Sequence, residues 1–363
     1  MKTEILPFDP RSVVRMAKLL TLDEVVALPT ETVYGLAGNA FRDQAIQKIF
    51  LAKERPSFDP LIVHISERYL THPKGLIPAL VQDGVLAPEI LGSPDLTRIH
   101  LAMKKYWPGP LTFILPRGQK IPDSVTASQP TVGIRCPAHP AFQAVLSTVS
   151  FPLAAPSANR FGRISPTEAM HVLSELGGRI PAILDGGSCD VGLESTIVRI
   201  DFPFEITLLR PGKISLEELS EAFQTKVMQG KTLGEKSHQT ISPGSLDEHY
   251  APTKPLFLFP HPFSHANELE SFLQSTSMPK KIAVLSMQKL IKPLSFPIVK
   301  TEILSAQNNL SEMAHSLFKS LRDLDADKNV EAILCDLPEE HGSGLAAAIA
   351  DRLRRASRNK PSV

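Results

Sequence analysis

Short apolar runs alternate with segments of helical periodicity through roughly the first 220 residues, and this alternation constrains the fold more than any other feature of the sequence. The runs with the length and character of strands are 25–28, 61–65, 111–115, 132–135, 153–155, 182–184, 196–200 and 207–209. Apolar residues recur with helical spacing over 13–20, 44–53, 166–176 and 216–223. Strands and helices mixed at this spacing predict an α/β domain.

A change of composition near residue 224 divides the chain. Residues 223–254 are polar and rich in Gly and Pro, with almost no periodicity, so we expect them to link two domains. The α/β pattern then resumes, with strand-like runs at 256–259, 281–286 and 330–336 and helical patterns at 306–324 and 344–357. The sequence therefore predicts a larger α/β domain over 1–222, which we expect to be the catalytic one, and a smaller, doubly wound, Rossmann-like α/β domain over 255–363.

Charge and cysteine content argue against several classes of protein. Lys+Arg minus Asp+Glu is 39 − 38 = +1, so no strong global field attracts the chain to nucleic acid or to a membrane. Three widely spaced cysteines argue against a disulfide framework and a structural zinc site. The N-terminus lacks the basic start and apolar run of a signal peptide, and no run approaches ~18 apolar residues. We therefore expect a cytoplasmic protein with no membrane partner.

Common catalytic and nucleotide-binding motifs are missing from the sequence. It contains no H-E-x-x-H, G-x-S-x-G or G-x-G-x-x-G. Gly230-Lys231-Thr232 imitates the end of a P-loop, but Thr225 stands where the first glycine belongs, and the segment lies in the expected linker. Any nucleotide bound here must therefore be held without a Walker A loop.

Polar and cationic side chains stand instead at the ends of several predicted strands and of one helix. Thr32 follows the run 25–28, and Lys53 and Arg55 end the helical pattern 44–53. Taken alone, such a cation pair fits ordinary surface charges that complement a helix dipole. His64, inside the apolar run 61–65, fits a core histidine equally well.

Further candidates follow in the second half of the first domain. Arg135 and Arg210 each end a predicted strand, while Ser157 and Asn159 lie in a run of small residues where a simple turn is the stronger local interpretation. Ser195 follows a glycine-containing loop. Each feature is weak alone. Together, cations and hydroxyls on the loops of one α/β unit suit a polyphosphate and a small polar acid held by side chains.

A series of short motifs follows in one order along the chain: PTETVYGL, K-x-R-P with D-P-L-I-V-H, PGPLT, TVGIRCPAHP, APSAN, SPT, DGG, ESTIV and LLRPG. This ordered set, over about residues 10–222, resembles the threonylcarbamoyl-AMP synthase family with its YrdC-like fold. The later SPGSLDEHYAP and PEEHGSGLAAAIADRLRRAS resemble the linker and the C-terminal domain of the family's long, two-domain form. Glu248 stands where the family more often has a basic residue.

The resemblance implies a reaction and its partners. It implies an L-threonylcarbamoyladenylate synthase that condenses L-threonine, bicarbonate and ATP, with Mg²⁺ on the triphosphate, and releases pyrophosphate. A separate transferase complex then passes the threonylcarbamoyl group to tRNA, so tRNA is only an indirect partner. This chemistry needs aligned reactants and donors for developing negative charge, not a protein nucleophile, so the missing triads and metal motifs are expected.

The resemblance also assigns individual residues. It implies that threonine is bound by Thr32, His64, Arg135, Ser195 and the backbone of Ala155. It implies that ATP is bound by Lys53, Arg55, Asp59, Thr131, Ser157, Asn159, Ser165, Arg210 and Tyr250, the last reaching the nucleotide from an expected lid at 242–252. We expect Lys53, Arg55, Ser157 and Asn159 to act most directly in catalysis, with Lys53 as an exposed side chain.

Two other functions compete with synthesis. One is an RNA-binding module that uses the same basic cleft, against which the net charge of +1 and the lack of an aromatic-rich basic strip both count. The other is a regulatory homologue that binds ATP without making the adenylate, against which the intact Lys53, Arg55, Ser157 and Asn159 count.

Overall fold

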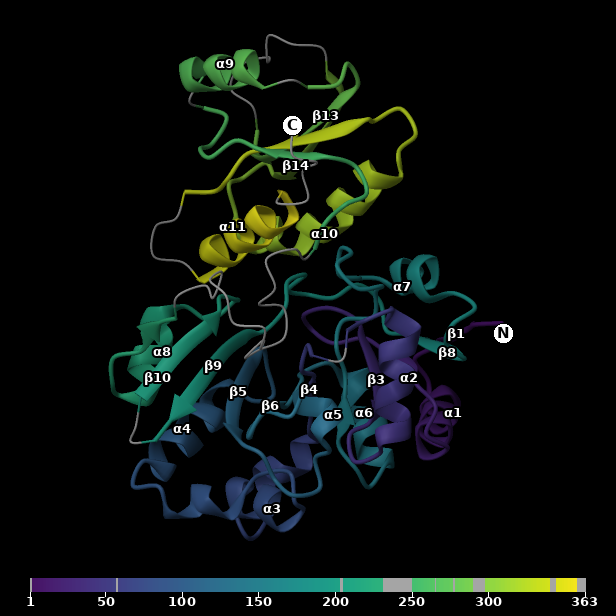
Figure 1. The fold of residues 1–363 in the computed structure, drawn as a ribbon, viewed down its shortest axis with the longest axis vertical. Coiled ribbons are helices and arrows are strands. Elements are labelled where there is room, and N and C mark those ends of the chain that lie inside the picture. The colour runs from purple at the N-terminus through teal and green to yellow at the C-terminus, as the bar shows by residue number, and fades with distance from the viewer. Residues whose placement is uncertain are drawn as a thin grey trace.

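A computed structural model describes residues 2–56, 58–202, 205–230, 250–264, 266–276, 278–289, 298–339 and 344–357. Figure 1 shows a large α/β domain with a smaller one above it. Helices α10 (Leu310–Ala326) and α11 (Gly344–Ser357) lie between the smaller sheet and the large domain, whereas α9 (Ala266–Ser275) lies on the far side of the smaller sheet. The α/β class expected from the sequence, with a mixed sheet followed by a Rossmann-like unit, is confirmed.

The large domain is built on a mixed sheet in the order β1-β8-β2-β3-β7-β4-β6-β5-β9-β10-β11. Its strands are β1 (Glu4–Pro7), β2 (Val26–Leu28), β3 (Gly35–Asn39), β4 (Ile62–His64), β5 (Leu111–Pro116), β6 (Thr131–Arg135), β7 (Leu153–Ala154), β8 (Ala182–Asp185), β9 (Thr196–Asp201), β10 (Glu205–Arg210) and β11 (Met228–Gln229). Strands β4 and β6 run parallel with His64 opposite Arg135. Two candidate side chains therefore end neighbouring strands at the same edge. The strand β11 extends this sheet into the range expected to be linker.

Helices cover the large sheet, and their ends follow local capping rules. They are α1 (Pro10–Thr21), α2 (Asp43–Lys53), α3 (Leu76–Gln82), α4 (Leu96–Tyr106), α5 (Asp123–Thr126), α6 (Pro140–Thr148), α7 (Ala169–Leu176), α8 (Leu216–Phe223) and the 3₁₀ turns η1 (Glu67–Thr71) and η2 (Pro88–Gly92). Asp9 caps α1 by accepting the Ser12 N–H at 2.8 Å. Ser215 and Glu218 form a reciprocal capping box on α8.

Several elements of the large domain differ from expectation: β1, β3, β11 and helices α3 to α6 were not predicted, and α7 begins later than predicted. The helix expected from residue 166 begins at Ala169, because the carbonyls of Pro166 and Thr167 accept backbone N–H groups from distant segments rather than from the helix. Strand β3 was not expected at all. Its sequence, GLAGN, offers no alternating large side chains, and a Cβ at Gly35 would lie 3.2 Å from the Cβ of Ala155. It is a strand because its backbone pairs antiparallel with β2 and β7, which no apolar periodicity reveals.

The smaller domain is a four-stranded parallel sheet in the order β12-β15-β13-β14. The strands are β12 (Leu256–Leu258), β13 (Ile282–Gln288), β14 (Ile298–Ser305) and β15 (Ala332–Cys335). Strand β14 is an addition to the expected pattern. Helix α10 therefore begins at Leu310 rather than at residue 306, with Asn309 accepting N–H groups from Ser311 and Glu312.

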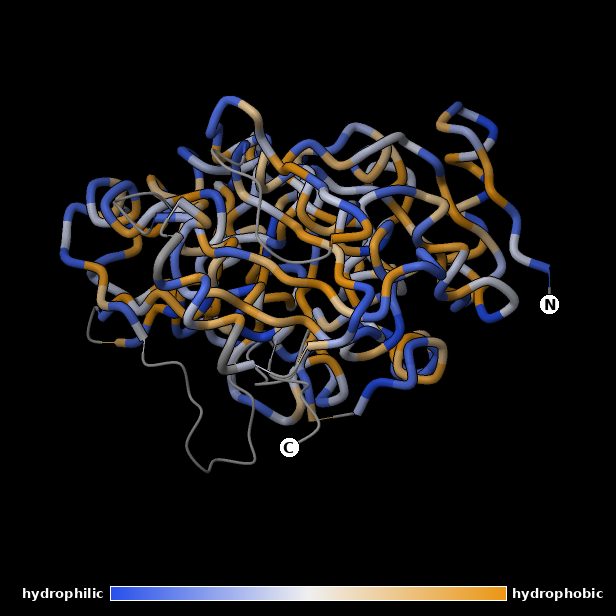
Figure 2. Tube along the Cα trace, turned by 90° about the horizontal axis from the view of Figure 1, so that it is seen from above, coloured by the Kyte–Doolittle hydropathy of each residue, from blue (hydrophilic) through white to orange (hydrophobic). Residues whose placement is uncertain are grey.

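One hydrophobic core crosses the boundary between the two domains. Val33, Ile164 and Leu193 of the large domain pack in the same buried cluster as Leu317 and Phe318 of α10. Figure 2 shows hydrophobic segments running through the middle of the molecule, with hydrophilic turns mostly at its rim. The smaller domain is therefore docked through apolar contacts. Among the described residues, no helix has the length and apolarity needed to cross a bilayer.

Candidate active site

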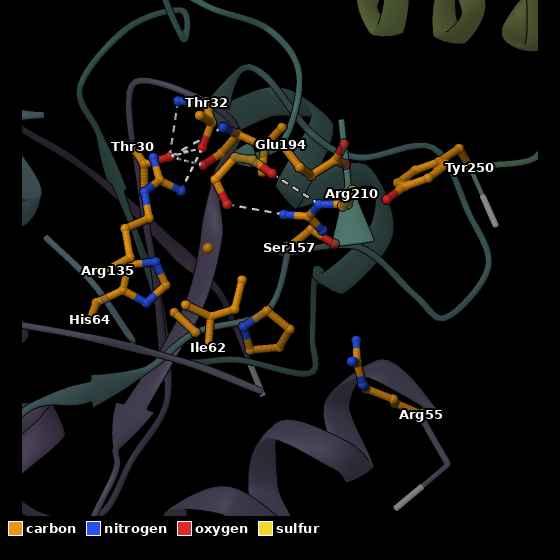
Figure 3. Close-up of a pocket in the computed structure, with 15 residues that line it drawn as sticks. Thr30, Thr32, Arg55, Ile62, His64, Arg135, Ser157, Glu194, Arg210 and Tyr250 are labelled. Atoms are coloured by element: carbon orange, nitrogen blue, oxygen red, sulfur yellow. Dashed lines mark hydrogen bonds between the residues drawn. The ribbon is translucent and has the colours of Figure 1, made fainter. Parts of the chain in front are cut away.

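A small cavity lies where several strands of the large sheet end, beneath the smaller domain. It has about 50 Å³ of free space. Its lining consists of Thr30, Thr32, Val33, Gly35, Arg55, Ile62, His64, Arg135, Ala155, Pro156, Ser157, Glu194, Ser195, Arg210 and Tyr250. In Figure 3 Thr30, Thr32, His64 and Arg135 lie at one side, and Arg55 and Tyr250 lie at the other.

The structure brings together all five residues that the family resemblance assigned to threonine. Arg135 donates through Nη1 to Thr32 Oγ1 at 3.0 Å and through Nε to the Gly109 carbonyl at 3.2 Å. Its Nη2 lies 2.7 Å from Glu31 Oε1, and the side chains of both partners are at least nine-tenths buried. Arg135 therefore already carries a carboxylate partner, which the sequence analysis did not anticipate.

His64 combines the two interpretations that the sequence left open. It is buried and packs against Phe142, with ring centroids 5.1 Å apart, and it also lines the cavity. Burial, reinforced by the positive charge of Arg135, lowers the pKa of His64 to about 3. Among the described residues, its Nδ1 has no hydrogen-bond partner. At neutral pH the cavity therefore presents an uncharged imidazole.

This buried imidazole predicts a specific loss of stability in acid. Because the folded-state pKa lies below the ordinary value of 6.5, the unfolded chain binds a proton first as the pH falls. The contribution is complete above about pH 6.5 and declines toward pH 3, so it falls by about 2 kcal/mol between pH 6.5 and 5. Urea unfolding of wild type and His64→Gln at both pH values measures it. Equal losses in the two proteins would contradict the assignment.

Ser195 and Arg210 form a second buried polar group at the cavity. Arg210 donates through Nε to the Ser195 carbonyl and through Nη2 to its hydroxyl, both at 3.0 Å. The Ser195 hydroxyl also lies 2.8 Å from Thr112 Oγ1. These bonds hold the start of β9 against the end of β10 and fix the Arg210 guanidinium at the cavity wall.

Arg55 reaches the cavity from the end of α2 and is held by Asp59. Arg55 Nη2 lies 2.8 Å from Asp59 Oδ2 and donates to the Pro60 carbonyl at 2.9 Å. Burial raises the pKa of the Asp59 carboxyl, whereas the charges of Arg55 and Lys53 oppose that rise. Asp59 does not line the cavity itself, so its contact with a nucleotide would run through Arg55.

Lys53 corrects one expectation: it is not exposed. Only 1% of the residue is accessible, and Nζ donates to the backbone carbonyls of Ser157 and Asn159 at 2.5 Å each. Burial and then the charge of Arg55 lower the pKa of Lys53 well below its ordinary range. Helix α2 packs against the sheet, and Lys53, in its last turn, is buried. Lys53 therefore ties the loop that carries Ser157 and does not itself line the cavity.

Three other expected nucleotide ligands also lie outside the cavity lining. Asn159 donates to the carbonyls of Arg160 and Arg163, at 2.7 and 2.9 Å. Ser165 donates to Glu194 Oε1 at 2.5 Å. Thr131 begins β6, at the opposite end from Arg135, and lines a smaller hollow. These side chains support the walls or lie beyond them.

The remaining wall comes from the end of the expected linker. Tyr250 is buried and stacks on Phe318 of α10, with ring centroids 5.7 Å apart. The rest of the expected lid before Tyr250, including Glu248, lies outside the described residues. Tyr250 thus stands between the cavity and the smaller domain.

Two carboxylates of the site were not assigned from the sequence: Glu194, which lines the cavity, and Glu31, which pairs with Arg135 but does not line the cavity. Each lies next to a residue that was assigned, Thr32 and Ser195, so the local sequence placed them near the site. Their partners are far along the chain: Arg135 for Glu31, and Arg352 of α11 for Glu194. No local pattern reveals such pairs.

Comparisons with known proteins agree over both domains. A family model described as "Telomere recombination" matches residues 18–212, and one described as "Threonylcarbamoyl-AMP synthase, C-terminal domain" matches residues 214–358. The threonylcarbamoyl-AMP synthase of Bacillus subtilis is 38% identical over 96% of this chain and 93% of its own length. That of Pyrococcus abyssi is 34% identical over 92% and 90%. A crystal structure of P. abyssi Sua5 complexed with L-threonine superposes with a TM-score of 0.81 and 32% identity, covering 98% of each chain.

Proposed function

The chain belongs to the threonylcarbamoyl-AMP synthase family, and from that premise we propose how its residues bind each substrate. It is an ATP-using nucleotidyltransferase that makes threonylcarbamoyl-AMP for the threonylcarbamoyladenosine modification of tRNA. The observation that carries the assignment of its residues is the cavity, which has a compact polar side at Arg135 and a second cationic side at Arg55.

Threonine binds at the side of the cavity formed by β4, β6 and the loop after β2. Arg135 bonds the threonine carboxylate, sharing its guanidinium with Glu31, and Thr32 and Ser195 supply hydroxyls. The Ala155 backbone and His64 Nδ1 form hydrogen bonds with the remaining polar atoms of threonine. Within the part of the chain that the structure describes, this Nδ1 has no other partner. L-Threonine bound to the P. abyssi relative supports this choice of ligand.

ATP binds toward the opposite side, between Arg55, Ser157, Arg210 and Tyr250. Cations there stabilise the triphosphate and the charge that develops at the α-phosphorus. Other assigned residues do not contact the nucleotide but hold the groups that do. Asp59 fixes the guanidinium of Arg55, and the loops that face the nucleotide are fixed by Lys53, Asn159 and Ser165. Thr131 contacts ATP only if the nucleotide extends to the smaller hollow. A cavity of about 50 Å³ is far smaller than a typical ligand site of ~300–1,000 Å³, so we propose that the substrates extend beyond its mouth.

The reaction needs no protein nucleophile. The threonine amine combines with bicarbonate to give a carbamate and water, the carbamate oxygen then attacks the α-phosphorus, and pyrophosphate leaves. Magnesium enters as the complex with ATP. Glu194 of the described lining faces Arg352, and Glu31, which lies outside the lining, faces Arg135. The described part of the chain holds no cluster of three metal-binding side chains. A cytoplasmic location, with a separate transferase complex taking the product to tRNA, completes the proposal.

Pyrophosphate release tests the proposed function. We expect release only when ATP, L-threonine and bicarbonate are all present, with threonylcarbamoyl-AMP appearing in equal amount by mass spectrometry. Serine in place of threonine serves as a matched control. Release from ATP alone, without an adduct, would support the regulatory alternative. Tight binding of a transcribed tRNA by a protein that releases no pyrophosphate would support the RNA-binding alternative.

A further inference from the structure

Glu194 places a carboxylate in the wall of the cavity on the nucleotide side. Its Oε1 accepts the Ser165 hydroxyl at 2.5 Å, and its Oε2 lies 2.9 Å from Nε of Arg352. Arg352 belongs to α11 in the smaller domain, 158 residues further along the chain, and its side chain has no exposed surface. A side chain of the smaller domain therefore neutralises a carboxylate of the proposed active site.

The pairing of Glu194 differs from that of the other carboxylates at the site. Glu31 and Asp59 face Arg135 and Arg55, which are in the same domain as they are. Only for Glu194, among these three, does the compensating cation come from the smaller domain. If that cation is removed, Glu194 remains as a buried negative charge beside the phosphate-binding side chains.

Arg352 also contacts the other walls on that side. Its Nη1 donates to the carbonyl of Pro211, directly after Arg210, at 2.9 Å. Its guanidinium lies 5.5 Å from the centroid of the Tyr250 ring. Asp351, at 2.9 Å, holds the same Nη1 from within α11. One side chain thus touches the segments that carry Ser195, Arg210 and Tyr250, although it does not itself line the cavity.

We propose that Arg352 is a positioning residue for ATP. Its guanidinium neutralises the negative charge of Glu194 and holds the segment that carries Arg210, so that the cavity can accept the negative charge of a triphosphate. The inference rests on the nucleotide side assigned above. Without Arg352 the buried Glu194 carboxylate would repel the phosphates and would compete with them for the charge of Arg210, with which it also interacts. Both effects are strong because charges interact more strongly where water is excluded. Threonine would be affected less, because its carboxylate is bonded by Arg135 at the opposite side, and Ser195 is its one assigned partner next to Glu194.

The test measures the KM for ATP and the KM for threonine in a set of variants. Arg352→Gln is expected to raise the KM for ATP about 10- to 100-fold and the KM for threonine less than about threefold, with a smaller change in kcat. Adding Glu194→Gln in the same chain removes the buried charge and is expected to restore the KM for ATP to within a few-fold of wild type. Arg352→Lys, which keeps the charge, should lie between wild type and Arg352→Gln.

Arg322→Gln is the matched control. Arg322 is also a largely buried arginine of the smaller domain. It lies 3.2 Å from Glu175 and donates to the backbone carbonyls of Ile164 and Ser165, but none of these three residues lines the cavity. Its loss should lower thermal stability without changing the KM for ATP selectively. If Arg322→Gln and Arg352→Gln have the same kinetic effect, or if Glu194→Gln fails to rescue, Arg352 is only an interface residue.

The same variants separate this inference from the proposed function. Calorimetric titration with ATP alone measures nucleotide affinity whether or not the adenylate forms. If wild type makes no adenylate but Arg352→Gln still weakens ATP binding and the second substitution restores it, only the proposed function has failed. Should Arg352→Gln not fold, the charge-neutral pair Arg352→Gln/Glu194→Gln gives the decisive value: wild-type ATP affinity supports the role, and a loss of 10-fold or more overturns it.

Discussion

Arg135→Ala is expected to lose about 3–5 kcal/mol of folding stability and to bind threonine at least 10- to 100-fold more weakly. The stability loss arises because the substitution leaves Glu31, whose side chain is 9% exposed, as a buried charge without its cation. The binding loss arises because a charge-assisted hydrogen bond to the threonine carboxylate is worth ~1.5–3 kcal/mol. The affinity for ATP, bound at the other side of the cavity, should barely change.

A second variant separates the two effects. Arg135→Gln/Glu31→Gln replaces the ion pair with two amides that can bond each other, so most of the stability should return while threonine binding stays weak. Chemical denaturation and calorimetric titration with threonine and with ATP measure the three quantities. If the double variant binds threonine as wild type does, Arg135 serves the fold and not the substrate. Loss of ATP binding with intact threonine binding would reverse the assignment.

Lys53→Ala is expected to lower kcat/KM by more than 100-fold and also to cost about 2–5 kcal/mol of stability. The sequence had suggested a loss of activity with little effect on stability, which would suit an exposed lysine. The structure shows a buried one, and its removal leaves a cavity and deprives the carbonyls of Ser157 and Asn159 of their shared donor. The Ser157 loop then shifts at the proposed phosphate site.

Lys53→Met is the control for packing. Methionine fills most of the space but donates no hydrogen bond, so stability should partly recover whereas activity should remain low. Thermal denaturation and initial rates of pyrophosphate release, measured on the folded fraction, make the comparison. A Lys53→Met enzyme with wild-type kcat/KM would show that the amino group matters only for packing.

The sequence alone predicted much of the scaffold, and its failures have identifiable causes. Strands rich in large apolar residues, such as β6, were placed within a few residues, as was α8 with its local capping box. Strand β3 was missed because its two glycines and one alanine give no visible alternation of apolar and polar side chains. The start of α7 was misplaced because Pro166 and Thr167 bond to distant backbone groups.

The candidate site divides in the same way. The sequence by itself determined which side chains stand at strand ends, because a strand's end depends on residues within a few positions. Those side chains include Arg135 and Arg210, whereas His64 was expected inside its apolar run and ends β4 only in the structure. Only the tertiary structure decided that Lys53 is buried, that Arg135 already faces Glu31, and that Glu194 is paired by an arginine from the other domain. Burial and ion pairing depend on which segments the fold brings within about 4 Å of each other. Glu194 and its partner Arg352 are 158 residues apart in the sequence.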